Sequence, residues 1–377
     1  MPIMSKSVCI IRSNPVRPDS RVEKEACSLK MNGYDVHVLA WDRDSNHKPC
    51  EEMLLVMGLE IPITRLGFKA SYGEGFKNIV SYLKFQFGMR KFLRKNYFDV
   101  IHACDFDTAF FSQGIVKRKK EKFIFDIFDF IASNPKTLFQ KIICCLQINL
   151  INRSDATIIC TEDRKRQISA SKPKKLAIIH NSPKMFPESY SKEFFDFEKN
   201  GKVKVVYVGI LQDYRLLKEI GEYFSKNHEI EWHVGGFGKY EEHFKKLADE
   251  NENIKFYGRI SYDKTIELER KCDICLAIYD PAIHNHVFAA PNKFYESLML
   301  GKPVVMVKGT GMSEIVKKKD IGVLIDYSYD GFEKGINELI SRKNSWIEMS
   351  ERMKRIYIKD YNWEIMEKRL CDLYEGL

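Results

Sequence analysis

The residues best suited to chemistry lie in one string in the second half of the chain, APNKFYESLMLGKPVV. Asn292 and Lys293 stand where a loop enters a predicted helix, Glu296 follows one turn in, and Gly301 marks the end of the helix. The free N–H groups and positive dipole end of such a helix attract phosphate. A carboxylate one turn in can accept both hydroxyls of a ribose. We therefore expect a nucleotide site here, since an ordinary capped helix would explain Gly301 but not the whole string.

Two aspartates in the first half of the chain are placed for proton transfer. Asp105 and Asp129 each follow an apolar run that predicts a strand, so both stand at strand exits, where ligands of parallel sheets bind. We expect them to take part in proton transfer and to contact the substrate, with loop capping as the alternative role. His102 is less suited because it lies inside the predicted strand.

A metal site is not expected from the cysteines and histidines. Cys272 and Cys275 have CxxC spacing, and His284 and His286 follow within reach. The segment alternates like a strand, however, which would point the two thiols to opposite faces, and no second CxxC is present. We interpret these cysteines as small core residues and assign no metal and no cofactor.

Composition narrows the class of protein. The chain has 377 residues, 44% of them hydrophobic and 30% charged, which predicts about two packed domains and excludes disorder. The net charge of +9 favours anionic ligands but is too scattered to predict nucleic-acid binding. The sequence shows neither a signal-peptide pattern nor an apolar stretch of membrane-spanning length, so we expect a cytoplasmic location with the 10 cysteines reduced.

The pattern of elements predicts an α/β fold. Apolar strand-like runs alternate with helical periodicity from residue 7 onward, which indicates parallel sheets covered on both faces. A polar, proline-bearing stretch then interrupts this rhythm before it restarts at Val203. We expect two Rossmann-like doubly wound domains facing across a cleft. They span residues 1–190 on the acceptor side and 201–345 on the nucleotide side, followed by C-terminal helices at 346–377.

Seven strings, in order and spread over nearly the whole chain, resemble one enzyme family. The chain is similar to the retaining family 4 glycosyltransferases of bacterial surface-polysaccharide type, which have the two-domain glycosyltransferase-B fold. The strings are RVEKEACSLKMNGYDVHVLAW, DVIHACDFDTA, IIHNSPK, VVYVGILQDYRLLKEI, WHVGGFGKYEE, NIKFYGRISYDK and PNKFYESLMLGKPVV.

The resemblance implies roles for individual residues. Arg215 takes the place of the basic residue that neutralises the donor diphosphate, with Lys218 or Lys293 as helper, and Glu296 binds the nucleotide ribose. The implied catalytic set is Asp105, Asp129 and Arg215. The implied donor-binding set is Arg215, Lys218, Gly235, Gly236, Gly238, Arg259, Asn292, Lys293 and Glu296.

The resemblance also implies a reaction. A sugar would pass, with retention, from a nucleotide diphosphate donor to a glycan or lipid-linked acceptor in surface polysaccharide or lipopolysaccharide assembly, without a metal. A sugar-nucleotide epimerase on the same fold and a noncatalytic nucleotide-sugar binder are the alternatives. A dinucleotide oxidoreductase is disfavoured because the first strand exits into NPVRPDS rather than a glycine-rich loop.

The chain departs from the family at three positions. Phe288 replaces a glutamate eight positions before Glu296, Ile210 replaces a basic residue after the strand glycine, and Phe128 replaces a histidine. Two Asp-x-Asp triplets match the metal motif of the other large glycosyltransferase fold, but that fold would not explain a second complete α/β half.

A helical segment in the first half suggests a membrane contact. Its first apolar face is expected to pack on the sheet, and the opposite face to insert into anionic lipid. The packing face is Phe76, Ile79, Val80, Leu83 and Phe87; the inserting face is Phe85, Met89 and Phe92; the basic residues are Lys77, Lys84, Arg90, Lys91, Arg94, Lys95 and 117–120.

The last 32 residues, 346–377, predict helices beyond the last strand of the second half. The resemblance implies that this tail crosses back to the first domain, with Trp363 and Leu370 as anchors.

Overall fold

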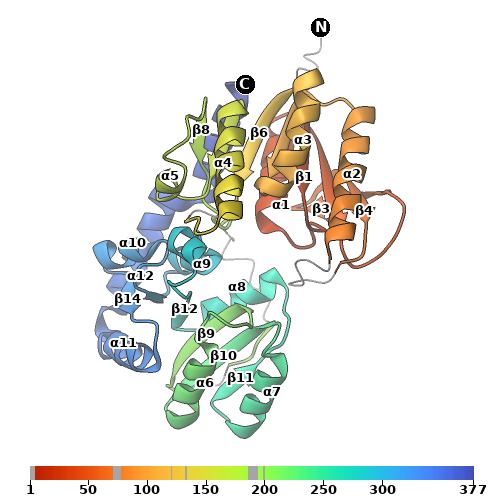
Figure 1. The fold of residues 1–377 in the computed structure, drawn as a ribbon. Coiled ribbons are helices and arrows are strands. Elements are labelled where there is room, and N and C mark those ends of the chain that lie inside the picture. The colour runs from red at the N-terminus through yellow and green to blue at the C-terminus, as the bar shows by residue number, and fades with distance from the viewer. Residues whose placement is uncertain (1–4, 71–77, 120, 132–133, 186–193, 198–199) are drawn as a thin grey trace. The chain divides into compact units, whose positions relative to one another are not determined.

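The computed structural model describes residues 5–70, 78–119, 121–131, 134–185, 194–197 and 200–377, with the backbone alone for 117–119. The chain forms two compact units (Figure 1). The first unit is Met1–His180 together with Met366–Leu377, and the second unit is Asn181–Ile365. Within the described ranges, no helix is both long and apolar enough to cross a membrane.

The first unit contains an eight-stranded sheet in the order β3-β4-β2-β1-β5-β6-β7-β8. Its neighbouring strands pair in parallel except β3 with β4, which are antiparallel. The strands are β1 (Ser7–Arg12), β2 (Asp35–Asp42), β3 (Cys50–Val56), β4 (Leu59–Gly67), β5 (Val100–Cys104), β6 (Lys122–Ile127), β7 (Ala156–Ile159) and β8 (Leu176–Ile178). The helices are α1 (Ser20–Met31), α2 (Ile79–Lys95), α3 (Asp105–Lys119), α4 (Leu138–Arg153) and α5 (Arg164–Gln167).

The second unit contains a six-stranded parallel sheet in the order β11-β10-β9-β12-β13-β14. The strands are β9 (Val203–Ile210), β10 (Ile230–Phe237), β11 (Ile254–Phe256), β12 (Ile274–Ala277), β13 (Val304–Val307) and β14 (Gly322–Ile325). The helices are α6 (Leu217–Lys226), α7 (Glu241–Glu250), α8 (Tyr262–Lys271), α9 (Asn292–Leu300), α10 (Ser313–Lys319) and α11 (Tyr329–Ser341), with a 3₁₀ turn η2 (His284–Phe288). The predicted α/β fold with two parallel-type sheets is confirmed.

The segment APNKFYESLMLGKPVV forms a helix with the expected ends. The α9 helix begins at Asn292, and Gly301 ends it in a left-handed conformation with φ of 67°. A Cβ at this position would also lie 2.2 Å from the hydroxyl of Ser350. Glycine is therefore required here both by the backbone conformation and by the close packing of the helix that carries Ser350.

The C-terminal helices are divided between the units. The helix α12 (Trp346–Ile356), the π-helical turn η4 (Tyr357–Tyr361) and the start of α13 (Trp363–Glu375) belong to the second unit, whereas residues from Met366 onward belong to the first. Of the two expected anchors, Trp363 is therefore buried with the second unit and Leu370 with the first.

The α13 helix is bound to the first unit by polar as well as apolar contacts. The hydroxyl of Ser28 donates to Glu367 at 2.7 Å, and Arg369 donates to the carbonyl of Ile178 at 3.0 Å. The side chain of Leu370 is fully buried. The last turns of the chain are thus part of the core of the first unit.

The faces of α2 are reversed relative to the sequence-based prediction. Phe85 and Met89 are fully buried, and Phe85 stacks on Trp41 with ring centroids 5.1 Å apart. On the same face Gly88 approaches Leu66, which its missing side chain permits because a Cβ would lie 3.1 Å from that residue. The predicted packing residues that the structure describes are instead exposed: Ile79 52%, Val80 59%, Leu83 40% and Phe87 70%. Phe76 and Lys77 lie outside the described residues.

Candidate functional site

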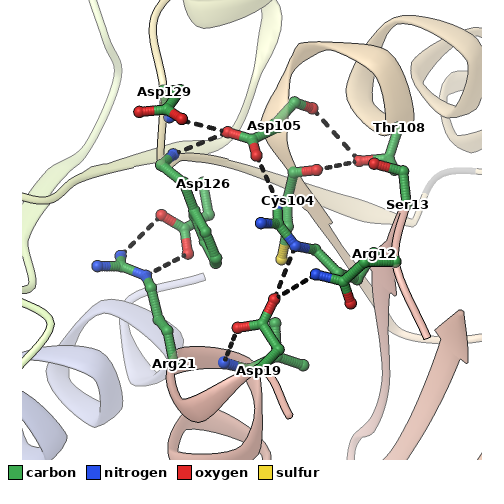
Figure 2. Close-up of polar contacts among 12 residues, drawn as sticks. Arg12, Ser13, Asp19, Arg21, Cys104, Asp105, Thr108, Asp126 and Asp129 are labelled. Carbon is green, nitrogen blue, oxygen red and sulfur yellow. Dashed lines mark hydrogen bonds and ion pairs between the residues drawn. The ribbon is translucent and has the colours of Figure 1, made fainter. Parts of the chain in front are cut away.

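In the first unit, three neighbouring strand ends converge on Asp105 (Figure 2). This residue follows β5 and has a positive φ of 68°. One carboxylate oxygen accepts the backbone N–H groups of Phe128 and Asp129, each at 3.0 Å, and the other forms a short ion pair with Arg12 at the end of β1. Asp105 therefore clamps the ends of β1, β5 and β6 together.

The two candidate aspartates differ in access to a substrate. The side chain of Asp105 is 19% exposed, and burial raises its pKa to about 6 against the opposing charge of Arg12. The side chain of Asp129 is 67% exposed and contacts Arg164 at 3.3 Å. A base must reach the proton that it removes. Asp129 is therefore the better placed of the two to meet a substrate, and Asp105 holds the backbone of Asp129 in position.

Phe128 lies between two arginines. The guanidinium carbons of Arg12 and Arg21 are 4.2 Å and 4.7 Å from its ring centroid. The family resemblance places a histidine at this position, which would become a third cation here on protonation. A neutral aromatic ring instead attracts both guanidinium groups.

Next to this site is a buried polar network that was not predicted from the sequence. Arg21 pairs with Asp126 at 2.8 Å and with Glu25 at 3.1 Å. His102 contacts Asp126 at 3.3 Å on one ring nitrogen and the hydroxyl of Tyr374, on α13, at 2.8 Å on the other. His102 thus serves the packing of the C-terminal helix.

The same network contains a possible set of metal ligands. Within the described ranges, ligand atoms of His102, Cys104 and Asp126 lie within 4.8 Å of one another. Asp126 is already paired with Arg21, however, and a cation beside that guanidinium would be repelled. We assign no metal to this group.

In the second unit, a pair of cations lies beside Tyr207 near the end of β9. The ammonium of Lys293 is 4.8 Å from the Tyr207 ring centroid. Burial raises the pKa of the Tyr207 hydroxyl, while the charges of Lys293 and Arg215 oppose that shift. A Cβ at Gly209 would lie 2.7 Å from the Lys293 ammonium. Lys293 therefore places a cation at the end of β9, where Ile210 stands at the position of the basic residue implied by the family resemblance.

Arg215 lies in the loop between β9 and α6. Its guanidinium carbon is 4.2 Å from the ring centroid of Tyr279, and it donates to the ring of His286 at 3.1 Å. Together with Lys293 it forms a two-cation cluster at adjacent parallel strands. Such a cluster can neutralise a diphosphate.

The other predicted residues of α9 have protein partners. Asn292 accepts a hydrogen bond from Asn181 at 2.7 Å. Glu296 is only 4% exposed and interacts with Tyr262 and Glu269. Burial, followed by the charge of Glu296, raises the pKa of Glu269 well above its usual range. Glu296 therefore lies in a buried acidic pair with Glu269, beside the hydroxyl of Tyr262.

Two further predicted donor residues contact aromatic rings other than Tyr207 and Tyr279. Lys218 contacts the ring of Tyr240 at 4.5 Å, and Arg259 contacts Phe237 at 4.6 Å. The three glycines at the end of β10 have a packing role. Gly236 and Gly238 have positive φ values, and a Cβ at these positions would meet the backbone of Gly209 and Leu211 respectively. A Cβ at Gly235 would meet the side chains of Ile260 and Val208.

The cysteines also differ from expectation. β12 begins at Ile274, so Cys272 lies at the end of α8 and not on the strand. Cys272 and Cys275 are buried together in one apolar cluster with Val206 and Leu268. The sequence-based statement that the thiols point to opposite faces was wrong, although their interpretation as core residues is confirmed.

Comparison with known proteins identifies the class of fold. Residues 190–359 match the family model "Glycosyl transferases group 1". No curated protein matches the chain in sequence. The two units together have the glycosyltransferase-B fold of the solved structures that they match.

Three of these structures illustrate the match. Sucrose-phosphate synthase from Thermosynechococcus elongatus has 13% identity and a TM-score of 0.77, with 98% of each chain covered. HepE from Anabaena in complex with UDP-glucose has 13% identity and a TM-score of 0.69, covering 99% of this chain and 100% of that one. WaaG, a glycosyltransferase involved in lipopolysaccharide biosynthesis, has 12% identity and a TM-score of 0.65, covering 97% and 99%.

Proposed function

We propose that the protein is a retaining glycosyltransferase that uses a nucleoside diphosphate sugar. The observation that carries the proposal is the two-cation cluster of Arg215 and Lys293 beside Tyr207, in the part of the chain that matches the group 1 family model. A departing nucleoside diphosphate needs positive charge at its phosphates. Arg215 and Lys293 supply this charge, and Glu296 accepts the ribose hydroxyls.

The acceptor in this proposal is a glycan or a lipid-linked sugar of a surface polysaccharide or lipopolysaccharide. Asp129 receives the proton of the acceptor hydroxyl, and Asp105 holds the Asp129 backbone. Transfer proceeds without a metal ion. Support for the donor class comes from the fold shared with HepE, whose structure holds UDP-glucose.

Release of nucleoside diphosphate tests this function. Purified protein is incubated with UDP-, GDP- and ADP-sugars, with and without lipid-linked acceptors, in magnesium and in EDTA. We expect release to depend on acceptor, to survive EDTA, and to give a product whose anomeric configuration by NMR matches the donor. Conversion of the donor sugar without acceptor would instead indicate an epimerase. Binding without any turnover would indicate a noncatalytic binder.

We further propose that the first unit docks on the cytoplasmic face of an anionic membrane, through residues other than those first predicted. The exposed apolar residues of α2 (Ile79, Val80, Leu83 and Phe87) share the helix surface with exposed Lys84, Lys91, Arg94 and Lys95. The helix contains no acidic residue. The helix α3 packs beside α2, and α4 packs beside α3 (Figure 1); together they add exposed Phe110, Leu138, Phe139 and Ile142. Apolar side chains rimmed by cations suit anionic lipid.

Vesicle co-sedimentation tests the docking surface. We expect binding to phosphatidylglycerol-containing vesicles, weaker binding at high salt, and none to pure phosphatidylcholine. Replacing Leu83 and Phe87 by Glu should abolish binding, because both side chains are exposed and would have to enter the lipid. The matched control is Ile347→Glu, which alters a 78% exposed side chain of the second unit. Equal binding to both vesicle types, or an equal loss in the control, would contradict this surface.

A further inference from the structure

The side chain of Arg215 is part of a closed ring of hydrogen bonds in the second unit. Arg215 donates through one nitrogen to the carbonyl of Tyr214 at 3.1 Å and to Nε2 of His286, also at 3.1 Å. The Tyr214 carbonyl also accepts the N–H of Asp280 at 3.1 Å. The Asp280 carbonyl in turn contacts Nδ1 of His286 at 2.8 Å. The ring therefore joins the loop after β9 to the segment after β12.

The partners of His286 determine which of its nitrogens carries the proton. A backbone carbonyl only accepts hydrogen bonds, so Nδ1 must donate to Asp280. In the neutral ring, Nε2 then carries the lone pair and accepts the N–H of Arg215. The ring is thus held in the tautomer that binds a guanidinium. A protonated ring would present an N–H to Arg215 and lose this bond.

The backbone on both sides of the contact is held in a defined conformation. Tyr214 and Leu216, which flank Arg215, both have positive φ values, 67° and 54°. Non-glycine residues rarely adopt this conformation, and those that do concentrate at functional sites. The carbonyl of His286 accepts the N–H of Gly311 at 2.8 Å. A Cβ at Gly311 would lie 2.0 Å from the carbonyl oxygen of Ala289, so only glycine permits this approach.

We propose that His286 is a positioning residue that fixes the Arg215 guanidinium, between the Tyr279 ring and its own Nε2, for the donor diphosphate. This inference rests on the proposed function. His286 does not contact the donor. It removes rotamer freedom from the arginine before the ligand arrives, which reduces the entropy lost on binding.

Two substitutions of His286 each keep one of its two hydrogen bonds and remove the other. The amide of glutamine reaches about as far as Nε2, so His286→Gln retains an acceptor for Arg215. The shorter asparagine reaches about as far as Nδ1, so His286→Asn retains the donor to Asp280 but loses Arg215. The affinities of UDP, GDP and ADP, and of uridine, guanosine and adenosine, are measured by calorimetry and ligand-observed NMR on the full-length protein.

For the diphosphate that binds the wild type, we expect His286→Asn and His286→Ala to bind about three- to tenfold more weakly, the cost of ordering one side chain that is no longer held in place. His286→Gln should bind within about twofold of wild type. Affinity for the matching nucleoside should change in none of them. Equal loss for diphosphate and nucleoside, or equal behaviour of Gln and Asn, would overturn the positioning role even if Arg215→Ala abolishes diphosphate binding. If no diphosphate binds the wild type, the proposed function and this inference both fail.

Discussion

Arg215→Ala is expected to weaken the binding of a nucleoside diphosphate by about 10- to 150-fold. The guanidinium lies beside Tyr207 and Tyr279, close to Lys293, and a charge-assisted hydrogen bond to phosphate is worth about 1.5–3 kcal/mol. The variant should fold normally because Arg215 is only partly buried. Isothermal titration of wild type and variant with the same nucleotide measures the difference.

Lys218→Ala is the matched control for Arg215→Ala. Lys218 is a cation in the first turn of α6, directly after the loop that carries Arg215. Its ammonium lies 4.5 Å from the centroid of the Tyr240 ring. We expect its removal to change the nucleotide affinity by less than about twofold, as for an exposed charge without a direct ligand contact. If Lys218→Ala loses affinity and Arg215→Ala does not, the diphosphate lies elsewhere.

Deleting residues 366–377 is expected to unfold the first unit. Met366, Leu370 and Tyr374 are fully buried there, and each contributes about 1.5–3 kcal/mol through its buried apolar surface. The sum is comparable to the whole stability of a typical domain, about 5–15 kcal/mol. The deletion also removes the Tyr374 hydroxyl from His102, which is completely buried. The amides of β5 should then lose their protection from hydrogen exchange.

Deleting only Gly376 and Leu377 is the control for the tail truncation. These residues follow α13, and their removal should leave protection of β5 unchanged. Tyr374→Phe keeps the ring and removes only the hydroxyl, so it should cost about 1 kcal/mol of unfolding free energy. Unchanged protection of β5 after the longer deletion would show that the last turns of α13 do not support the first unit.

The order of strands and helices could be predicted because each parallel strand is a short apolar run and each helix has its own periodicity. The placement of Asp105 and Asp129 followed from the same pattern, since β5 and β6 are neighbours and their carboxyl ends meet. The α9 helix could be located because Gly301 provides a strong local end signal. These are local signals that do not depend on distant partners.

Features that depend on tertiary partners could not be predicted. α2 has two apolar faces, and periodicity alone does not decide which one packs inward; the close approach of Gly88 to Leu66 exists only once β4 is in place. The antiparallel pairing of β3 with β4 was likewise not identified. His286 was considered only as a zinc ligand, because its partner Arg215 lies 71 residues away along the chain.

Thermal denaturation of the wild-type protein with nucleotides tests the central claim most directly. UDP, GDP, ADP and CMP and their sugar conjugates are added one at a time, with the free sugars as controls. A ligand held only by the native state stabilises it by about 2.7 kcal/mol at 100 times its Kd. We predict that one nucleoside diphosphate and its sugar conjugate raise Tm, and that the free sugars do not. If no nucleotide raises Tm at millimolar concentration, the assignment of a nucleotide-sugar site to the second unit is contradicted.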